Sequence, residues 1–191
     1  MKIIIATKNM AKFDIISKML KTLSDKNVIV KSLNDINQFK DVEEVGTNIE
    51  RAKAKALNTY NNITESFDAI IGIDDGIIIN DIEYVAVKDH LYDIIIGDKV
   101  PVGERIYITR AYYLITKENI RKYCYNKIPY IVQKKLLSYK KDGYQLNDVI
   151  STIDNNKVLS NRNTEELNKY FLNYSINDLE ELIKVIPKEL N

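Results

Sequence analysis

Hydrophobic and polar residues follow one another along the first half of the chain in blocks that predict strands and helices in turn. An apolar run over Lys2–Ala6 ends in polar residues and predicts a buried strand. Apolar positions then recur at helical spacing over Lys12–Leu23, and again over Thr47–Tyr60. A short strand over Val28–Val30 and a polar, irregular segment over Ser32–Val45 lie between the two predicted helices. This order of elements predicts an α/β fold.

Two adjacent acidic residues interrupt the next apolar segment. Ala69–Ile73 and Ile77–Ile79 predict two strand pieces, and Asp74-Asp75-Gly76 stands between them, at the end of the first. Two like charges beside a buried strand cost free energy unless a cation or hydrogen-bond donors compensate them. The segment therefore predicts either a Mg²⁺ site for a phosphate substrate or a polar turn, because Asp-Gly is also a turn dipeptide.

The middle of the chain shows a less regular pattern. We interpret Ile94–Ile96 as a short strand, whereas Ile106–Ile115 fits either a strand or a buried helix, since periodicity does not separate the two. Tyr130–Tyr139 and Tyr144–Ile150 flank Lys141-Asp142-Gly143 and predict a β-hairpin.

Capping residues predict two helices at the end of the chain. Asn163 with Glu166 makes a start that resembles a capping box, Ser175 with Asp178 starts a second helix, and Pro187 closes it. The sequence contains neither an internal repeat nor a linker rich in Gly, Ser or Pro. We therefore predict one domain over residues 1–191.

The composition excludes several classes of function. With 28 Lys and Arg against 27 Asp and Glu, the net charge of +1 provides no general attraction for nucleic acid or an anionic membrane. A single cysteine, Cys124, and a single histidine, His90, exclude an internal disulfide and a Cys- or His-rich zinc site. These counts fit a reducing setting. No apolar run fits a signal peptide or approaches about 20 residues, so we expect a cytoplasmic, soluble protein.

Polar residues gather where the predicted first strand passes into the first helix. Thr7, Lys8, Asn9 and Lys12 stand at this junction. A helix N-terminus offers free N–H groups and positive potential, and ligands of open α/β sheets bind at the carboxyl ends of strands. The junction is therefore either a phosphate site or an ordinary capped helix start.

Three other groups of residues carry candidate chemistry beside an ordinary structural interpretation. Glu43 and Glu44 precede a helix that carries Lys55, and they form either a functional site or a surface ion pair. Arg162, after Ser160 and Asn161, is of a type that can bind a base edge or a phosphate through its planar fork, or simply belong to a loop. Tyr144 can stack on a base or fill a strand.

Taken in order, these segments resemble the inosine triphosphate pyrophosphatase family, whose members hydrolyse non-standard purine nucleoside triphosphates. Thr7, Asn9 and Lys12 match a motif T-x-N-x-x-K, and residues 43–56 resemble E-E-x-G-x-(T)-x-x-E-N-A-x-x-K-A, which places Lys55 on the phosphate-binding lysine. Asp74-Asp75-Gly76 resembles the start of D-D-S-G-L. Residues 143–148 and 160–162 weakly resemble the motifs G-F-G-Y-D-P and S-H-R.

The sequence also departs from the family pattern at defined positions. Arg51 stands in place of an asparagine, Gly76 in place of the serine, and Asn161 in place of a base-reading histidine. Lys157 lies three residues before Ser160, whereas the family lysine lies four before it. The residues expected for phosphate and metal binding are therefore better retained than those for base recognition.

The resemblance implies a fold, an assembly and a reaction. It implies an elongated, mixed, twisted sheet flanked by helices, with two lobes and a central cleft, and a homodimer. It implies Mg²⁺-dependent hydrolysis of a nucleoside triphosphate to a nucleoside monophosphate and pyrophosphate. The alternatives are a nucleotide-binding module on the same fold that has lost turnover, and a Maf-like nucleotide pyrophosphatase, whose S-x-S-P-R-R-type opening this sequence lacks.

The same resemblance assigns roles to individual residues. Lys12, Lys55 and Asp75 would be catalytic, Asp75 by activating water. Further substrate contacts would come from Thr7, Lys8, Asn9, Tyr144, Lys157, Ser160, Asn161 and Arg162, with Tyr144 and Arg162 on the base. The metal ligands would be Glu43, Glu44, Asp74 and Asp75.

Overall fold

The computed structural model describes residues 1–24, 27–36, 42–43, 45–85, 87–138 and 145–186. Its strands are β1 (Lys2–Ala6), β2 (Ile29–Ser32), β3 (Ala69–Ile79), β4 (Ile82–Tyr84), β5 (Arg105–Thr116), β6 (Arg121–Val132) and β7 (Ile150–Thr152). Its α-helices are α1 (Met10–Leu23), α2 (Asn48–Asn62), α3 (Val87–Ile95) and α4 (Thr164–Ile183). Short 3₁₀ helices are η1 (Leu33–Asp35), η2 (Gln145–Asp148) and η3 (Leu159–Asn161).

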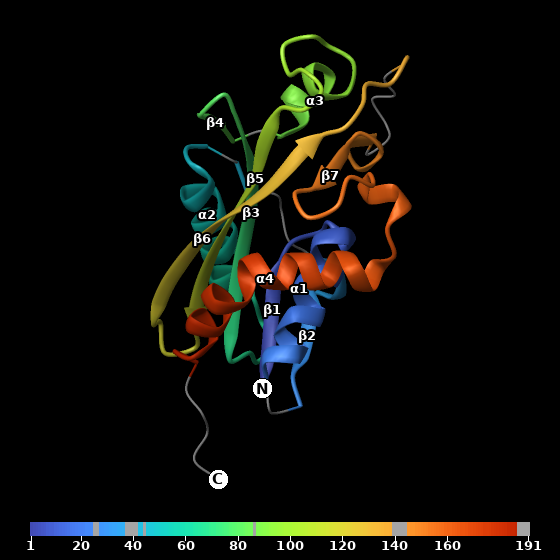
Figure 1. The fold of residues 1–191 in the computed structure, drawn as a ribbon. Coiled ribbons are helices and arrows are strands. Elements are labelled where there is room, and N and C mark those ends of the chain that lie inside the picture. Colours follow the sequence, from blue (N-terminus) through green and yellow to red (C-terminus); the bar gives the residue numbers. More distant parts are fainter. Residues whose placement is uncertain (25–26, 37–41, 44, 86, 139–144, 187–191) are drawn as a thin grey trace. The chain divides into compact units, whose positions relative to one another are not determined.

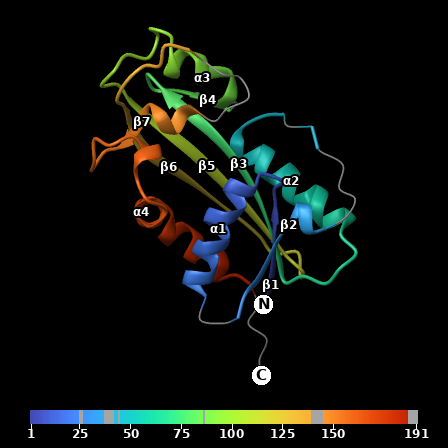
Figure 2. The same ribbon diagram turned by 90° about the vertical axis from the view of Figure 1, so that its right-hand side faces the viewer.

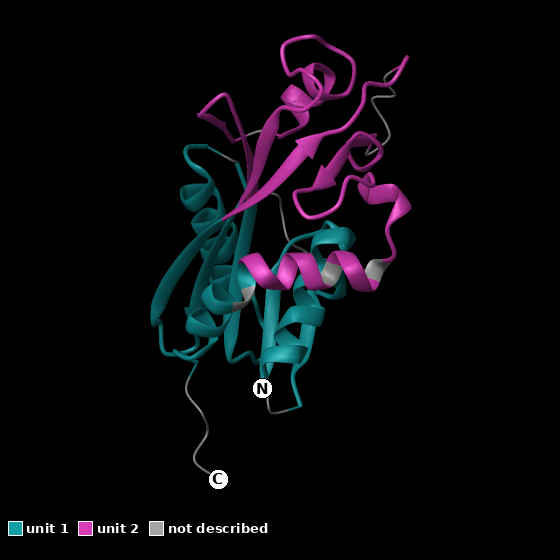
Figure 3. Ribbon diagram, in the orientation of Figure 1, with its two compact units in different colours: residues 1–74, 110–126, 175–191 teal, residues 75–109, 127–174 magenta. Residues whose placement is uncertain are grey.

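The described strands form one mixed sheet, which confirms the predicted α/β fold (Figure 1). The order across the seven-stranded sheet is β2-β1-β3-β5-β6-β7, and β4 pairs with β3. The chain divides into two compact units (Figure 3). The first comprises residues 1–74, 110–126 and 175–191, and the second comprises residues 75–109 and 127–174.

In the first unit, the carboxyl end of β1 lies beside the middle of β3. β1 pairs in parallel with β2 on one side and with β3 on the other, and Ala6 lies opposite Gly72. The chain leaves β1 through α1 to reach β2, and it crosses back through α2 to reach β3. Because parallel crossovers are right-handed, these opposite directions place the two helices on opposite faces of the strands, as Figure 2 shows. β1 and β3 therefore flank a topological switch point, the usual ligand position in such sheets.

The helix α2 packs unusually close to β3. Ala52 and Ala56 of α2 are fully buried against Ile4 and Ile70 of the strands. A Cβ on Gly72 would overlap the carbonyl oxygen of Ala52 and stand 2.8 Å from the nitrogen of Ala56. Small residues on both elements thus bring the helix backbone onto the strand.

The core of the second unit lies between the sheet and its own helices. Ile94 and Ile95 of α3 share one apolar cluster with Ile77, Ile106 and Ile128 from three strands. The expectation of a strand over Ile94–Ile96 is therefore wrong. These isoleucines complete a helical face that begins at Leu91, which is also buried. A helix and a short buried strand look alike in so brief an apolar run.

The strand β3 runs without interruption through Asp74-Asp75-Gly76. The expected break at these residues, as a turn or a strand end, is therefore wrong. Pairing with β1 supports the first part of β3, and pairing with β4 supports the last part. The turn comes at Asn80 and Asp81, whose φ angles of 50° and 62° suit a two-residue hairpin.

The structure also decides the expectations for the second half of the chain. Ile106–Ile115 lies within the strand β5, which settles the alternative left open. The predicted hairpin strands are wrong in extent, because β6 ends at Val132 and residues 145–148 form η2. The antiparallel partner of β6 is instead β7, with Val132 opposite Ile150. The predicted turn at 141–143 lies outside the described residues.

One helix, α4, replaces the two helices predicted at the end of the chain. Asn163 caps it as predicted, since its Oδ1 accepts a hydrogen bond of 2.8 Å from the nitrogen of Glu166. Ser175 does not begin a second helix but is buried within α4. The sequence between residues 164 and 183 contains neither Gly nor Pro, so nothing interrupts the helix there. Pro187 lies outside the described residues.

Candidate functional site

The carboxylate of Asp74 lies between two cations from α2. Lys55 Nζ is 2.5 Å from its Oδ1, and Arg51 Nε is 3.1 Å from its Oδ2. Arg51 and Lys55 are four residues apart, so they share one face of the helix and reach the same side chain. Among the described residues, no donor satisfies hydrogen-bond geometry at Oδ2, so the contact with Arg51 is an ion pair. One carboxylate thus holds two basic side chains.

Local features of the chain position this cluster. Gly72, two residues before Asp74, lies on the same face of β3 and allows α2 to approach. The start of α2 is held by a capping box, in which the nitrogen of Thr47 donates to Glu50 Oε2 at 2.8 Å and the nitrogen of Glu50 donates to Thr47 Oγ1 at 3.3 Å. The position of Lys55 therefore follows from both the cap and the close packing.

The electrostatic environment of Asp74 combines burial with positive charge. Its side chain is only 4% exposed, and burial raises the pKa of the carboxyl above its ordinary value. The hydrogen bond from Lys55 acts in the opposite direction on this pKa, as do the charges of Lys55, Arg51 and Lys12. Lys12 belongs to the first turn of α1, so the start of that helix contributes to the same field.

The start of α1 is held by its own polar side chains. The Oδ1 of Asn9 accepts from the nitrogen of Lys12 at 3.2 Å, and Thr7 Oγ1 accepts from the nitrogen of Asn9 at 3.1 Å. The side-chain amide of Asn34 donates to the carbonyl of Lys8 at 3.0 Å and holds the loop. Because Ala6 lies opposite Gly72, the loop that begins at Thr7 starts one residue before the level of Asp74. The first turn of α1 carries no acidic residue, so the positive potential at this helix start suits an anion.

The expected metal site does not fit these residues as they are arranged. Asp74 and Asp75 are adjacent in a continuous strand, so their side chains point to opposite faces of the sheet. Both oxygens of Asp74 already face cations, which would repel a divalent ion. In the part of the chain that the structure describes, no group of three His, Cys, Asp or Glu side chains could hold a metal ion. Glu43 is exposed, and Glu44 lies outside the described residues.

The residues expected to contact a base belong to the second unit, where Arg162 has structural partners. Its side chain is 7% exposed, and its Nη1 donates to Oγ1 of Thr152. Its Nε lies 3.1 Å from Oε2 of Glu166, and Nη1 lies 3.6 Å from Asp154. The guanidinium thus ties η3 and α4 to β7. The neighbouring Lys157, Ser160 and Asn161 are exposed, and Tyr144 lies outside the described residues.

In the first unit, the structure brings Lys55 and Arg51 into contact with Asp74, and the charge of Lys12 also acts to lower the pKa of that carboxyl. The sequence resemblance treats Arg51 only as a departure from the family pattern. Its position four residues before Lys55 is the signal that could have placed it on the same helix face.

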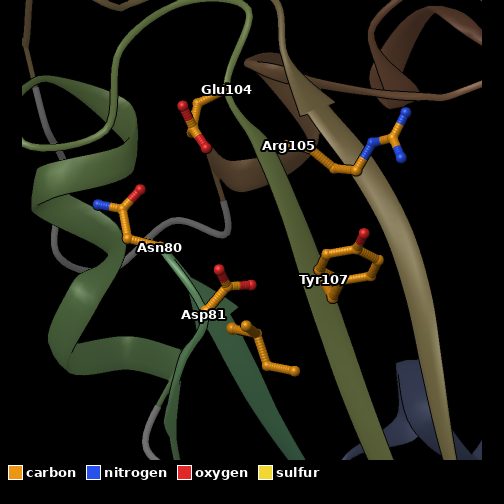
Figure 4. Close-up of a pocket in the computed structure, with 6 residues that line it drawn as sticks. Asn80, Asp81, Glu104, Arg105 and Tyr107 are labelled. Carbon is orange, nitrogen blue, oxygen red and sulfur yellow. The ribbon is translucent and has the colours of Figure 1, made fainter.

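A shallow pocket of about 370 Å³ in the second unit contains none of the predicted site residues (Figure 4). Asp81 and Glu104 contribute two acidic side chains to its lining, and Arg105 contributes one basic side chain. Asn80 and Asp81 form the turn between β3 and β4, so the pocket lies beside a hairpin tip. This mixed lining does not favour a particular ligand.

Known structures share the fold across almost the whole chain. A nucleoside-triphosphatase / dITP/XTP pyrophosphatase from Mycobacterium abscessus is 17% identical with a TM-score of 0.61, covering 96% of this chain and 99% of its own. The Ham1 protein of Staphylococcus aureus is 15% identical with a TM-score of 0.64, and the HAM1 protein of Coxiella burnetii is 14% identical with a TM-score of 0.66. For both, the match covers 96% of this chain and 98% of theirs.

Sequence comparison provides no corresponding match. No protein-family model matches this chain, and no curated protein matches it. The likeness to the solved structures therefore concerns the fold. Within the described residues, none of the helices combines the length and the apolar character needed to cross a membrane.

Proposed function

We propose that this protein hydrolyses nucleoside triphosphates to nucleoside monophosphates and pyrophosphate. The observation that carries the proposal is the pair of cations, Lys55 and Arg51, that contact Asp74 at the switch point between β1 and β3, with Lys12 at the start of α1 adding to the same field. The fold adds support, because one of the structures that share it is described as a dITP/XTP pyrophosphatase. The motifs at residues 7–12 and 43–56 point to the same chemistry.

The basic residues would overcome the main obstacle to this reaction. Water attacks the α-phosphorus, the bond from that phosphorus to the bridging oxygen breaks, and pyrophosphate leaves with that oxygen. A polyphosphate repels a nucleophile until its charge is neutralised, and negative charge grows on the leaving oxygen. Lys12 and Lys55, with the N–H groups at the start of α1, would bind the phosphates and stabilise this charge.

The proposal gives Asp75 the task of orienting the attacking water or accepting its proton. Asp75 is half-buried in β3, and its side chain lies on the face of the strand opposite to that of Asp74, so the cluster around Asp74 gives this role no support. The role of Asp75 rests on the sequence resemblance, and Asp75→Asn tests it. Asp74 does not hold Mg²⁺ in this proposal, because both of its oxygens face cations.

The test is release of pyrophosphate from dITP, XTP and the four ordinary ribonucleotides, measured with and without added Mg²⁺. We expect turnover by the wild-type protein and a loss of at least about 100-fold in kcat in Asp75→Asn, since general-base catalysis contributes about that much or more. Lys53→Gln is the matched control, because Lys53 is exposed on the same helix as Lys55. Binding of nucleotides without release of pyrophosphate would instead indicate a binding module.

The proposal also includes a preference for non-standard purines and a homodimer, as the sequence resemblance implies. The ratio of kcat/KM for dITP to that for dATP measures the first. Sedimentation equilibrium of the full chain measures the second.

A further inference from the structure

We propose that Arg51 is a phosphate-binding residue of this site, and that Asp74 is the counter-ion that positions Arg51 and Lys55 rather than a ligand of Mg²⁺. This inference rests on the proposed function and concerns how the same site binds its substrate. It follows from the arrangement of Arg51, Lys55 and Asp74. The sequence resemblance instead treats Arg51 as a departure from the family pattern and Asp74 as a metal ligand.

The distances show how Asp74 uses its two oxygens. Oδ1 faces Lys55 Nζ at 2.5 Å, and Oδ2 faces Arg51 Nε at 3.1 Å. A Mg²⁺ ion bound to either oxygen would sit about 2.1 Å from it and close to a protein cation. Repulsion between these charges disfavours the metal, whereas the two ion pairs offset the burial of the carboxylate.

The same contacts restrict the two basic side chains. The side chains of Arg51 and Lys55 are only 12% and 17% exposed, so both are held close to the protein. Long side chains lose rotamer entropy when they bind a ligand, and a counter-ion that orders them beforehand reduces this cost. Asp74 therefore prepares two cations, one helical turn apart, for a single polyanion.

Arg51 is chemically suited to this role. Asp74 contacts the guanidinium at Nε, and a guanidinium carries five N–H donors in a planar fork that matches the oxygens of a phosphate. The charge of Lys12 acts on the same carboxylate from the start of α1. A polyphosphate at the end of β1, beside the middle of β3, would thus be bound by basic residues from both helices.

The experiment measures binding of inorganic pyrophosphate to the full chain by calorimetry, first in EDTA and then with Mg²⁺. We expect Arg51→Gln to weaken binding in EDTA at least about tenfold, because a charge-assisted hydrogen bond accounts for that much or more. Arg51→Lys should restore part of the loss. Lys53→Gln, the matched control on the exposed face of α2, should change the affinity less than twofold.

A second measurement separates a positioning role of Asp74 from metal binding. In the hydrolysis assay, Asp74→Asn should raise KM while leaving the Mg²⁺ concentration for half-maximal activity unchanged. A tenfold rise in that concentration, or wild-type pyrophosphate binding by Arg51→Gln, would overturn the inference. If Asp74→Asn fails to fold, the Arg51 variants decide alone.

These outcomes are distinct from failure of the proposed function. A chain that binds pyrophosphate through Arg51 but releases none from any nucleotide would reject the hydrolase proposal and retain Arg51 as an anion ligand. A chain that hydrolyses nucleotides at the wild-type KM in Arg51→Gln would retain the hydrolase and reject the role of Arg51.

Discussion

The ammonium group of Lys55 lies 2.5 Å from Oδ1 of Asp74, which is 19 residues further along the chain. This contact joins the middle of α2 to the middle of β3, inside the first compact unit. Because the Asp74 side chain is 4% exposed, its negative charge depends on protein cations more than on water. The pair therefore links the stability of the unit to the electrostatics of the candidate site.

Lys55→Gln should destabilise the protein by roughly 2–3 kcal/mol at pH 7. Breaking a buried ion pair costs about 3–5 kcal/mol, and the partial exposure of Lys55 reduces this figure. Urea denaturation measures the loss, and Lys53→Gln should change stability by less than about 0.5 kcal/mol. Adding Asp74→Asn to Lys55→Gln should recover part of the loss, because the unpaired carboxylate is then absent.

The loss caused by Lys55→Gln should shrink as the pH falls. Burial raises the pKa of Asp74 above its unfolded value, and removing Lys55 raises this pKa further. A carboxyl whose pKa is higher in the folded state than in the unfolded state favours folding while it is protonated. This contribution is complete below the unfolded pKa and is lost as the pH rises through the folded pKa. The difference from wild type should thus be smaller at pH 4.5 than at pH 7. An equal difference at both values would contradict this account of Asp74.

Gly72→Ala should destabilise the protein by about 3 kcal/mol and weaken pyrophosphate binding. The added Cβ would overlap the carbonyl oxygen of Ala52, so α2 would have to move away from β3 and carry Lys55 with it. Gly103→Ala is the control, because no atom of the described residues lies within 4 Å of an added Cβ and only the φ of +90° is strained. Thermal unfolding and calorimetry measure the two effects. An unchanged affinity for pyrophosphate in a folded Gly72→Ala protein would contradict the proposed link between the position of α2 and phosphate binding.

Asn9→Ala should lower stability by about 1 kcal/mol, since the Asn9 side chain caps α1 through the nitrogen of Lys12. Asn163→Ala removes the corresponding cap of α4 and should cost about as much. Only Asn9→Ala should also weaken pyrophosphate binding, because its helix start belongs to the candidate site. If the two variants bind pyrophosphate with equal affinity, the start of α1 does not belong to that site.

Arg162→Gln should lower stability by about 1–2 kcal/mol, because its buried guanidinium binds Thr152 and Glu166. The ratio of kcat/KM for dITP to that for dATP should stay within about twofold, since these contacts already engage the side chain. Arg121→Gln, at an exposed arginine, is the control for loss of charge. A changed ratio would instead support the base contact that the sequence resemblance implies.

The amphipathic segments at the start of the chain were predictable because their patterns are local. The strand β1 has the predicted bounds, and the ends of α1 and α2 differ from the predicted ones by two residues or fewer. The cap at Asn163 was also readable, since its partner Glu166 lies three residues away. In contrast, three isoleucines at 94–96 resemble a strand in the sequence, and only packing against the sheet showed that Ile94 and Ile95 complete a helical face.

The sequence by itself determined which segments carry an apolar face, where two helices begin, and that basic residues follow the first strand. These properties depend on neighbours within about one helical turn. Only the tertiary structure decided that β3 continues through Asp74 and that Arg51 joins Lys55 there. Pairing with β1 and β4, and the close approach of α2 at Gly72, come from residues far apart in the chain. Because water no longer screens a buried charge, the protein groups beside it then determine how well that charge is stabilised.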